Sequence, residues 1–324
     1  MIEKQFAEIA QLINNSRHKA LSAVNRELIE LYWKIGQYID NRIENAQWGK
    51  SVVEELAAYL QSWEPDIKGF SGSNLWRMRQ FYSLYKGFPN LAPLVREISW
   101  TNNLIIFSRC KDEHEREFYI RLSKKEKYGK RELDRQISSG LYERTKLGNV
   151  ILAPAVRELH PAAENTFKDS YIFDFLNLQE NYNENDLQKG LINQMKDFIL
   201  ELGSDFLFFG EEYKLQVGNS DFYIDLLFYH RGLQCLVAFE LKTATFRPEH
   251  IGQLNFYLEA LDRDVKKSHE NPSIGILLCK DKDNEIVEYS LSRSLSATMV
   301  AEYQIKLPDK KLLQEKLRII FNMQ

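Results

Sequence analysis

Apolar residues recur every three or four positions through the first part of the chain. This spacing places them on one face of a helix and predicts helices over residues 3–63. The helical pattern stops at Pro65, because the residue before a proline disfavours the helical conformation. The apolar residues that repeat in this way are Ile9, Leu12, Ile13, Leu21, Val24, Leu28, Leu31 and Tyr32.

Helical spacing continues after this break. Another helix is predicted to begin within residues 71–75, with Ser73 or Asn74 as its N-cap, because such side chains cap helix starts. Three more helices are predicted over residues 99–109, 113–122 and 130–137. We therefore expect residues 1–148 to form an all-α domain.

Periodicity fades between residues 149 and 170, where Pro154 and Pro161 lie in a polar stretch. We interpret residues 149–170 as a linker and residues 171–324 as a second domain. A helix over 184–202, ended by Gly203, opens this domain. Runs of aromatic and β-branched residues then predict strands, and helical spacing returns between and after them. The predicted strands are 206–209, 213–217, 222–229, 235–241, 274–279 and 299–305, and the predicted helices are 253–261 and 310–321. We expect an α+β protein of two domains, the second an α/β domain with a mixed sheet.

Composition narrows the class of protein. The 324 residues carry a net charge of −3 and three scattered cysteines. No C-x-x-C pair occurs, which excludes zinc ribbons and redox dithiols and fits a reducing cytoplasm. The first residues lack the features of a signal peptide, and no stretch has the roughly 20 apolar residues that span a membrane. We expect a cytoplasmic protein.

Asp225, Glu240 and Lys242 lie on two adjacent apolar strands, which a short turn containing Gly232 connects. Gly232 is expected to supply the positive φ of this turn. Glu240 and Lys242 are two residues apart and therefore share one face of their strand. Charged groups on buried strands are costly unless they are paired or bind a metal.

These residue types suit phosphodiester cleavage that depends on a divalent cation. Mg²⁺ (or Mn²⁺) is held by one or two carboxylates, here Asp225 and Glu240, and the carbonyl of Leu241 is a candidate third ligand. The metal would activate a water and stabilise charge on the phosphate. Lys242 would orient that water or stabilise the developing negative charge.

Asp225 followed by Glu240-Leu241-Lys242 resembles the PD-(D/E)XK nuclease signature. Gln253 and Tyr257, four residues apart on the next helix, resemble the Q-x-x-x-Y element of some branches of that superfamily. Over nearly the whole chain the sequence is similar to the YhcG-like nucleases. The segments that carry this likeness are 221–230, 240–242, 255–257 and 276–281, with 69–71, 74–75, 78–79, 81–82, 116–119 and 141–144 in the N-terminal half.

The resemblance implies a restriction-endonuclease-like core with the element order α-β-β-β-α-β, as predicted for the second domain. It implies a bacterial nuclease with Asp225, Glu240, Lys242, Gln253 and Tyr257 in its catalytic site. The first helix of this superfamily often adds an acidic metal ligand, for which Glu201 is the candidate.

Structural explanations compete with each assignment. An E-x-K strand is often a solvated edge or a salt bridge. Gln253 and Tyr257 are also consistent with an ordinary helical pair, and Glu201 with a surface residue. Asp221 is a rival to Asp225, but it lies nearer the start of the strand. No H-E-x-x-H, Walker A or G-x-S-x-G motif supports a zinc hydrolase, nucleotide hydrolase or serine hydrolase.

Residues 66–146 contain seventeen Lys or Arg and ten Asp or Glu, an excess of seven positive charges. Such a region can hold a nucleic-acid backbone. Solvated helix faces are the alternative, and aromatics such as Trp76 belong either to a core or to a base-stacking surface. The candidate contacts are Arg77, Arg79, Lys124, Lys125, Lys127, Lys130 and Arg131.

The sequence as a whole predicts a metal-dependent nuclease, with DNA as the expected substrate. The alternative is a non-catalytic subunit that binds nucleic acid or another protein in a restriction or defence complex. A homodimer is a further option for the helical domain.

Overall fold

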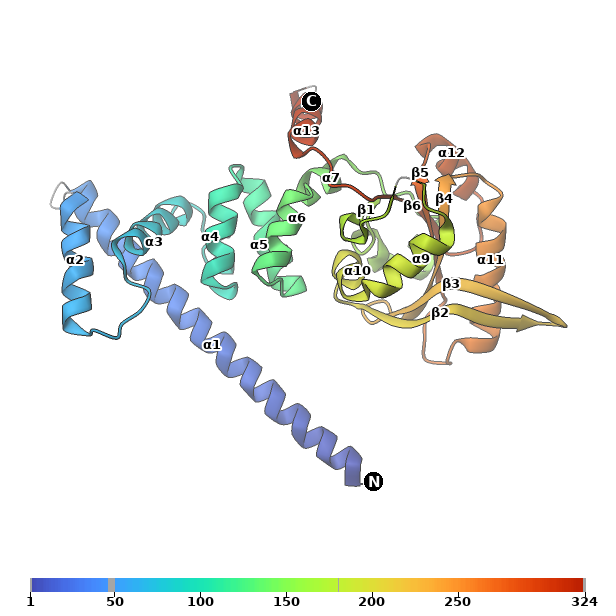
Figure 1. The fold of residues 1–324 in the computed structure, drawn as a ribbon, viewed down its shortest axis with the longest axis horizontal. Helices are drawn as coiled ribbons and strands as arrows, with labels where there is room; N and C mark the ends of the chain where they lie inside the picture. Colours follow the sequence, from blue (N-terminus) through green and yellow to red (C-terminus); the bar gives the residue numbers. More distant parts are fainter. Residues whose placement is uncertain (1, 46–49, 180, 323–324) are drawn as a thin grey trace. The chain divides into compact units, whose positions relative to one another are not determined.

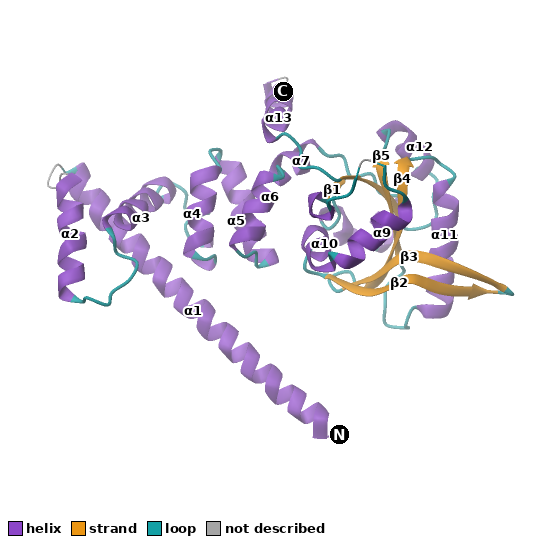
Figure 2. Cartoon of the chain, viewed as in Figure 1, coloured by secondary structure: helices purple, strands orange, loops and turns teal. Residues whose placement is uncertain are grey.

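The computed structural model describes residues 2–45, 50–179 and 181–322. The chain divides into two compact units, residues 1–137 and 138–324. Figure 2 shows that all strands belong to the second unit. The predicted fold class, an all-α part followed by an α/β part with a mixed sheet, is confirmed. No helix in the described ranges is both long and apolar enough to cross a membrane.

The first unit is built on one long helix. Two aromatic residues of this helix, α1, pack edge-on against rings of α3 and α4. The ring centres of Trp33 and Phe81 are 5.7 Å apart, and those of Tyr32 and Trp100 are 4.8 Å apart. Ser71 caps α3, so the predicted cap, Ser73 or Asn74, is wrong by two or three residues. The elements are α1 (Ile2–Glu44), α2 (Lys50–Trp63), α3 (Gly72–Tyr85), η1 (Leu94–Glu97), α4 (Trp100–Arg109), α5 (Glu113–Glu126) and α6 (Lys130–Ser138).

The second unit begins with elements that the sequence did not predict. They are α7 (Leu141–Leu147), α8 (Pro154–Leu159), η2 (Pro161–Asn165), β1 (Ser170–Ile172) and η3 (Asp174–Leu176). Two of them, α8 and η2, fall within residues 149–170, the expected linker. Leu152 forms a bridge with Met299, and Val156 is buried in the core of the second unit. The domain limits drawn from the sequence stay a prediction.

The predicted strands and helices of the second unit are present, with two changes. The helix expected over 184–202 is divided at Gln194 into α9 (Glu184–Asn193) and α10 (Met195–Leu202). The two first strands are one strand, β2 (Phe206–Val217), with a bulge between Phe208 and Gly210. The other elements are β3 (Ser220–His230), β4 (Cys235–Thr245), α11 (His250–Ala260), the π-helical turn η4 (Leu261–Val265), β5 (Ile274–Asp281), α12 (Asn284–Leu291), β6 (Thr298–Gln304) and α13 (Lys310–Asn322). Among these, α12 was not predicted.

The six strands form one mixed sheet in the order β1-β6-β5-β4-β3-β2. β2, β3 and β4 are antiparallel neighbours, whereas β4, β5, β6 and β1 are parallel. Figure 1 shows the β2–β3 hairpin extending beyond β4, which agrees with pairing of β3 to β4 only over residues 226–230. The sheet therefore contains a point at which β3 and β4 separate.

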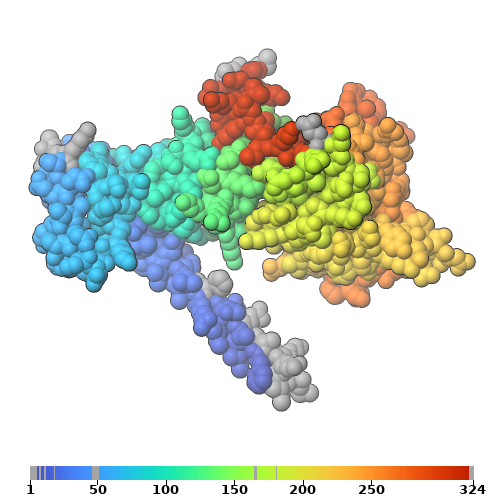
Figure 3. Space-filling view, in the orientation of Figure 1, coloured from blue at the N-terminus to red at the C-terminus, as the bar shows by residue number. Residues whose placement is uncertain are grey.

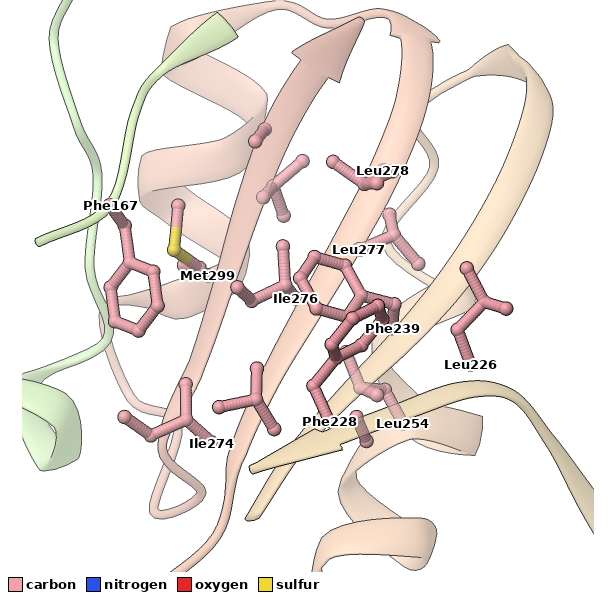
Figure 4. Packing of buried hydrophobic residues seen from close by; sticks show 14 of the residues in the cluster. Phe167, Leu226, Phe228, Phe239, Leu254, Ile274, Ile276, Leu277, Leu278 and Met299 are labelled. Atoms are coloured by element: carbon pink, nitrogen blue, oxygen red, sulfur yellow. The ribbon is translucent and has the colours of Figure 1, made fainter. Parts of the chain in front are cut away.

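Aromatic and aliphatic side chains pack tightly against the centre of this sheet. Phe228 and Phe239 lie 5.4 Å apart, and Phe198 of α10 contacts both rings edge-on. Figure 4 shows Phe228 and Phe239 near Ile276 and Leu226. This core fixes the position at which β3 and β4 end their pairing.

The turn between β3 and β4 differs from the expected one. Gln234, and not Gly232, has the positive φ, at 53°. Nδ1 of His230 accepts a hydrogen bond of 3.0 Å from the backbone N–H of Leu233 and so closes the turn. The prediction for Gly232 is therefore wrong, because the side chain of His230 shapes the loop.

Candidate active site

The candidate site lies where β3 and β4 separate. Leu226 and Phe239 form the last pair of that ladder, and Asp225 and Glu240 are the next residue on each strand. Oδ2 of Asp225 accepts a hydrogen bond of 2.7 Å from the backbone N–H of Leu241. The side chain of Asp225 thus takes the place of the next ladder bond and is held beside β4.

Asp225 is also fixed from the helix α9. Nε2 of Gln188 donates a hydrogen bond of 2.9 Å to the backbone carbonyl of Asp225. Burial raises the pKa of the Asp225 carboxyl, while the hydrogen bond from Leu241 and the charge of Lys242 lower it. The carboxylate is therefore positioned in advance and partly shielded from water.

Glu240 is buried, with only 2% of its surface exposed. Its Oε1 accepts a hydrogen bond of 2.9 Å from Nζ of Lys242. Its Oε2 is buried and receives no hydrogen bond from any described residue. Burial, and then the charge of Asp225, raise the pKa of Glu240 to about 7. A buried carboxylate oxygen without a partner is costly, and a bound cation would remove that cost.

Lys242 is the cation of this site. Burial lowers the pKa of its ammonium group, but the attraction of Glu240 outweighs burial and leaves the pKa raised. A second carboxylate, Oε2 of Glu184, lies 3.4 Å from Nζ. Lys242 is therefore charged and held by two acidic residues.

Gln253 and Tyr257 lie on α11 and are joined as their spacing predicts. Nε2 of Gln253 donates a hydrogen bond of 2.6 Å to the Tyr257 hydroxyl. Burial, and secondarily the charges of Glu240 and Asp225, raise the pKa of Tyr257, whereas the Gln253 hydrogen bond lowers it. Tyr257 is thus close enough to Glu240 and Asp225 for their charges to raise its pKa.

Glu201, the other predicted metal ligand, lies elsewhere. Its Oε1 accepts a hydrogen bond of 3.1 Å from the backbone N–H of Ile172 and lies 3.4 Å from Nζ of Lys168. Ile172 belongs to β1, which is separated from β4 by two strands, or roughly 14 Å at the usual strand spacing. Glu201 therefore joins α10 to the far edge of the sheet, and we do not include it in the site.

Asp221, the rival to Asp225, lies near the tip of the hairpin. Its carboxylate is 2.8 Å from Nζ of Lys214 on β2. Both side chains are substantially exposed. The surface ion pair accounts for Asp221 without a catalytic role.

Sequence reasoning missed four residues around the site: Glu184, Gln188, Glu212 and His250. Burial, and then the charge of Lys242, lower the pKa of His250, which begins α11. Glu184 starts α9 directly after its cap, Asn183, and so stands at a helix end. The sequence carries no motif for these four residues. Each comes near Asp225 or Lys242 only because separate elements pack together in the fold.

The candidate ligands for a metal at this position are two carboxylates and a backbone carbonyl. Within the described ranges, no three His, Cys, Asp or Glu side chains meet closely enough to form a ready-made metal site. The set of Asp225, Glu240 and the carbonyl of Leu241 still fits a hard cation such as Mg²⁺, which prefers oxygen ligands and keeps several waters. The unpaired Oε2 of Glu240 is the atom that fits such an ion best.

The basic candidates of the first unit differ in their surroundings. Arg79 lies 3.0 Å from the buried carboxylate of Asp40, and Lys124 lies 2.7 Å from Glu97. Lys125 is 3.8 Å from Glu126. Lys127 ends α5 with a positive φ of 53° and is exposed. Arg77, Lys130 and Arg131 are exposed and form no ion pair with another described residue.

Comparison with known proteins shows two regions of similarity along the chain. Residues 164–318 match the model of the YhcG PDDEXK nuclease domain, and residues 8–144 match the DUF1016 N-terminal domain. In order along the chain, the sequence is therefore similar first to a DUF1016 N-terminal domain and then to a YhcG PDDEXK nuclease domain. The predicted resemblance to YhcG-like nucleases is thereby confirmed.

The chain is 29% identical over 346 residues to a protein of Escherichia coli (strain K12) named "Putative nuclease YhcG". The match covers 95% of this chain and 92% of the relative. The match to the PDDEXK nuclease domain supports a nuclease function, and nucleases are hydrolases.

Two solved structures show faint similarity. A repair endonuclease from Pyrococcus abyssi has a TM-score of 0.26 and 15% identity, over 40% of this chain and 50% of that chain. EndoMS in its apo form has a TM-score of 0.25 and 16% identity, over 40% of this chain and 49% of that one. Similarities this weak support no conclusion about this protein.

Proposed function

We propose that this protein is a metal-dependent nuclease that hydrolyses phosphodiester bonds, with DNA as its substrate. The observation that carries the proposal is the buried, unpaired Oε2 of Glu240 beside Asp225 and Lys242. A purely structural ion pair would satisfy both carboxylate oxygens, because an unpaired buried oxygen destabilises the fold. Here one oxygen remains available for a cation.

Asp225, Glu240 and the carbonyl of Leu241 would hold Mg²⁺ or Mn²⁺. Such an ion, when bound, supplies an activated water and stabilises negative charge on the phosphate. The hydrogen bond from Leu241 to Asp225 keeps one carboxylate in place before substrate arrives. Positions fixed in advance reduce the reorganisation needed during the reaction.

Lys242 and Tyr257 would act on the substrate side of the site. The ammonium of Lys242 can orient the attacking water or offset negative charge that develops on the phosphate. The Tyr257 hydroxyl accepts the hydrogen bond from Gln253, so its own proton can be donated to a phosphate oxygen. Gln253 thus positions Tyr257.

The test is incubation of the purified full chain with single- and double-stranded DNA and RNA, with Mg²⁺, Mn²⁺ or a chelator. We expect cleavage of DNA that requires the metal and is abolished in Glu240→Gln, which keeps the side-chain size and removes the charge. The matched control is Glu302→Gln on β6, a partly buried glutamate outside the site. Cleavage by Glu240→Gln at the parent rate would reject the proposal, and preferential RNA cleavage would change the substrate.

We propose a second function for the helical domain, the binding of another protein chain, either a second copy or a subunit of a defence complex. The observation is a series of exposed apolar residues on α1, including Phe6 at 64% and Val24 at 67% exposure. Figure 3 shows the blue surface of α1 reaching past the other helices of its unit. Water-exposed apolar patches often mark protein interfaces.

Light scattering on the full chain tests this second proposal. Replacing Leu21 and Val24 by Ser should convert an oligomer to a monomer, or release a co-purified partner. Equivalent changes at Leu295, which is 95% exposed but belongs to the other unit, should have no effect. A parent chain that is monomeric and binds no partner would exclude an interaction role for α1.

A further inference from the structure

Glu212 lies directly opposite Asp225 in the β2–β3 hairpin. The pairs Glu211–Leu226 and Tyr213–Ile224 flank this position, so the register leaves Glu212 and Asp225 facing each other. Glu212 has a positive φ of 42°, a conformation that non-glycine residues rarely adopt, so the regular ladder is interrupted beside Asp225. Glu212 is therefore a neighbour of the candidate metal site from a third strand.

The bulge in β2 selects Glu212 for this place. Before the bulge, Phe208 pairs with Phe228, and after it Gly210 pairs with Leu227, so the register shifts by one residue. Without that shift, Glu211 would be the residue opposite Asp225. Bulges of this kind turn side chains towards or away from functional sites.

The resulting arrangement sets like charges side by side. Glu212, Asp225 and Glu240 occupy neighbouring positions on β2, β3 and β4. The charge of Glu212 is one of the influences that raise the pKa of Asp225, after burial and Glu184. Like charges directly opposite each other destabilise a ladder. A cation bound close to Asp225 would offset the repulsion between these carboxylates.

A second observation points to the same ligand. Only 2% of the surface of Glu240 is exposed, and its Oε2 has no hydrogen-bond partner among the described residues. The row of carboxylates thus ends at a buried oxygen that lacks a partner. Glu212 is exposed, so it approaches this centre from the solvent side.

We propose that Glu212 is a further residue of the cation site and accepts a hydrogen bond from water held by the ion at Asp225 and Glu240. Contact through water suits the absence of three converging acidic side chains in the described ranges. It also suits Mg²⁺, which keeps several of its waters. The inference rests on the proposed function, because it needs a cation between Asp225 and Glu240.

The experiment compares Glu212→Gln with Glu211→Gln in the full chain. Glu211 is the adjacent glutamate, and it pairs with Leu226 instead of lying across from Asp225. Mn²⁺ and Ca²⁺ affinity is measured by titration calorimetry, and the melting temperature is measured in chelator. Loss of a partner that contacts metal-bound groups typically weakens metal affinity roughly 10–100-fold.

Glu212→Gln should weaken cation binding by about tenfold or more and raise the melting temperature in chelator, because it relieves the repulsion with Asp225. Glu211→Gln should change neither quantity. A residue with only a structural role would lower the melting temperature and leave the affinity of the remaining folded protein unchanged. If Glu212→Gln binds the cations as tightly as the parent chain, with or without a lower melting temperature, the inference is wrong and the proposed function still stands. A parent chain that binds neither cation overturns both.

Discussion

Nζ of Lys242 lies 2.9 Å from Oε1 of Glu240, on the same strand and two residues away. The other oxygen of that carboxylate is buried without a partner in the described part of the chain. Lys242 therefore neutralises Glu240 only in part, and it is held at the edge of the position that we assign to the metal.

Lys242→Ala should lower the rate of cleavage by on the order of 10²–10³, because one preorganised electrostatic donor is lost. Lys242→Arg should also fail, since a planar guanidinium does not replace a compact ammonium. Single-turnover cleavage at saturating metal measures the effect. Lys214→Ala is the control, because Lys214 pairs with Asp221 at the hairpin tip. A parent-like rate in Lys242→Ala would remove Lys242 from the mechanism.

Stability without metal should depend on pH through Glu240. Burial and the charge of Asp225 raise the pKa of Glu240 from 4.5 to about 7. The folded chain therefore keeps a proton that the unfolded chain has lost between these pH values. The stabilising effect of that proton is complete below pH 4.5 and is lost as the pH rises through about 7. The free energy of unfolding should fall by roughly 3 kcal/mol over this range.

Urea unfolding in chelator at several pH values from 4.5 to 8 measures this dependence. Glu240→Gln should remove most of the decrease, because the amide does not titrate. Cation affinity should change in the opposite sense and rise over the same pH window, because the metal competes with the proton. If the parent and Glu240→Gln lose stability in parallel, the pKa of Glu240 is not raised as described.

The strands that carry the site were predictable because their residue types repeat over several positions. Apolar runs identified β3, β4 and β5, and the spacing of Gln253 and Tyr257 fixed their common helix face. The short helices α7 and α8 were not predictable, since fewer than two turns give too little periodicity. Their stability comes from packing, as the burial of Val156 in the core shows.

The neighbours of the metal pair depend on register and could not be read from sequence. Glu212 faces Asp225 because a bulge shifts β2 by one residue. Glu184 reaches Lys242 because α9 begins beside β4. Glu201 was a candidate because it lies on the first helix of the domain, but the break at Gln194 places it on α10, where it contacts Ile172.

Tyr257→Phe should lower the cleavage rate by a smaller factor than Lys242→Ala. One hydroxyl hydrogen bond is lost, typically worth 0.5–1.5 kcal/mol, which corresponds to about a 2- to 13-fold change in rate. Gln253→Ala should have an effect of similar size, and the double variant should be little worse than either one, because Gln253 acts through Tyr257. Tyr289→Phe, at an exposed position, is the control. Fully additive losses would show that the two residues act independently.

The last prediction separates binding from cleavage. If the basic segment of the first unit holds the nucleic-acid backbone, binding should weaken with salt and depend little on sequence. The variant replaces the five basic residues Lys124, Lys125, Lys127, Lys130 and Arg131 by Gln. Its affinity should fall and its dependence on salt should flatten, in proportion to the phosphate contacts removed. Lys127, Lys130 and Arg131 should contribute most, because they are exposed and form no ion pair with a described residue, unlike Lys124 and Lys125.

Fluorescence anisotropy in Ca²⁺ at several salt concentrations measures this binding, with Asp225→Ala as the comparison. Asp225→Ala should abolish cutting and leave binding nearly unchanged, because it removes a proposed metal ligand and no proposed phosphate contact. Replacing Lys189, Lys196, Lys266, Lys267 and Lys280 of the second unit controls for the loss of five charges. If the first variant binds as tightly as the parent at every salt concentration, the helical domain does not hold the nucleic acid. The exposed apolar residues of α1 would then be its main functional surface, which favours a role in binding a second chain.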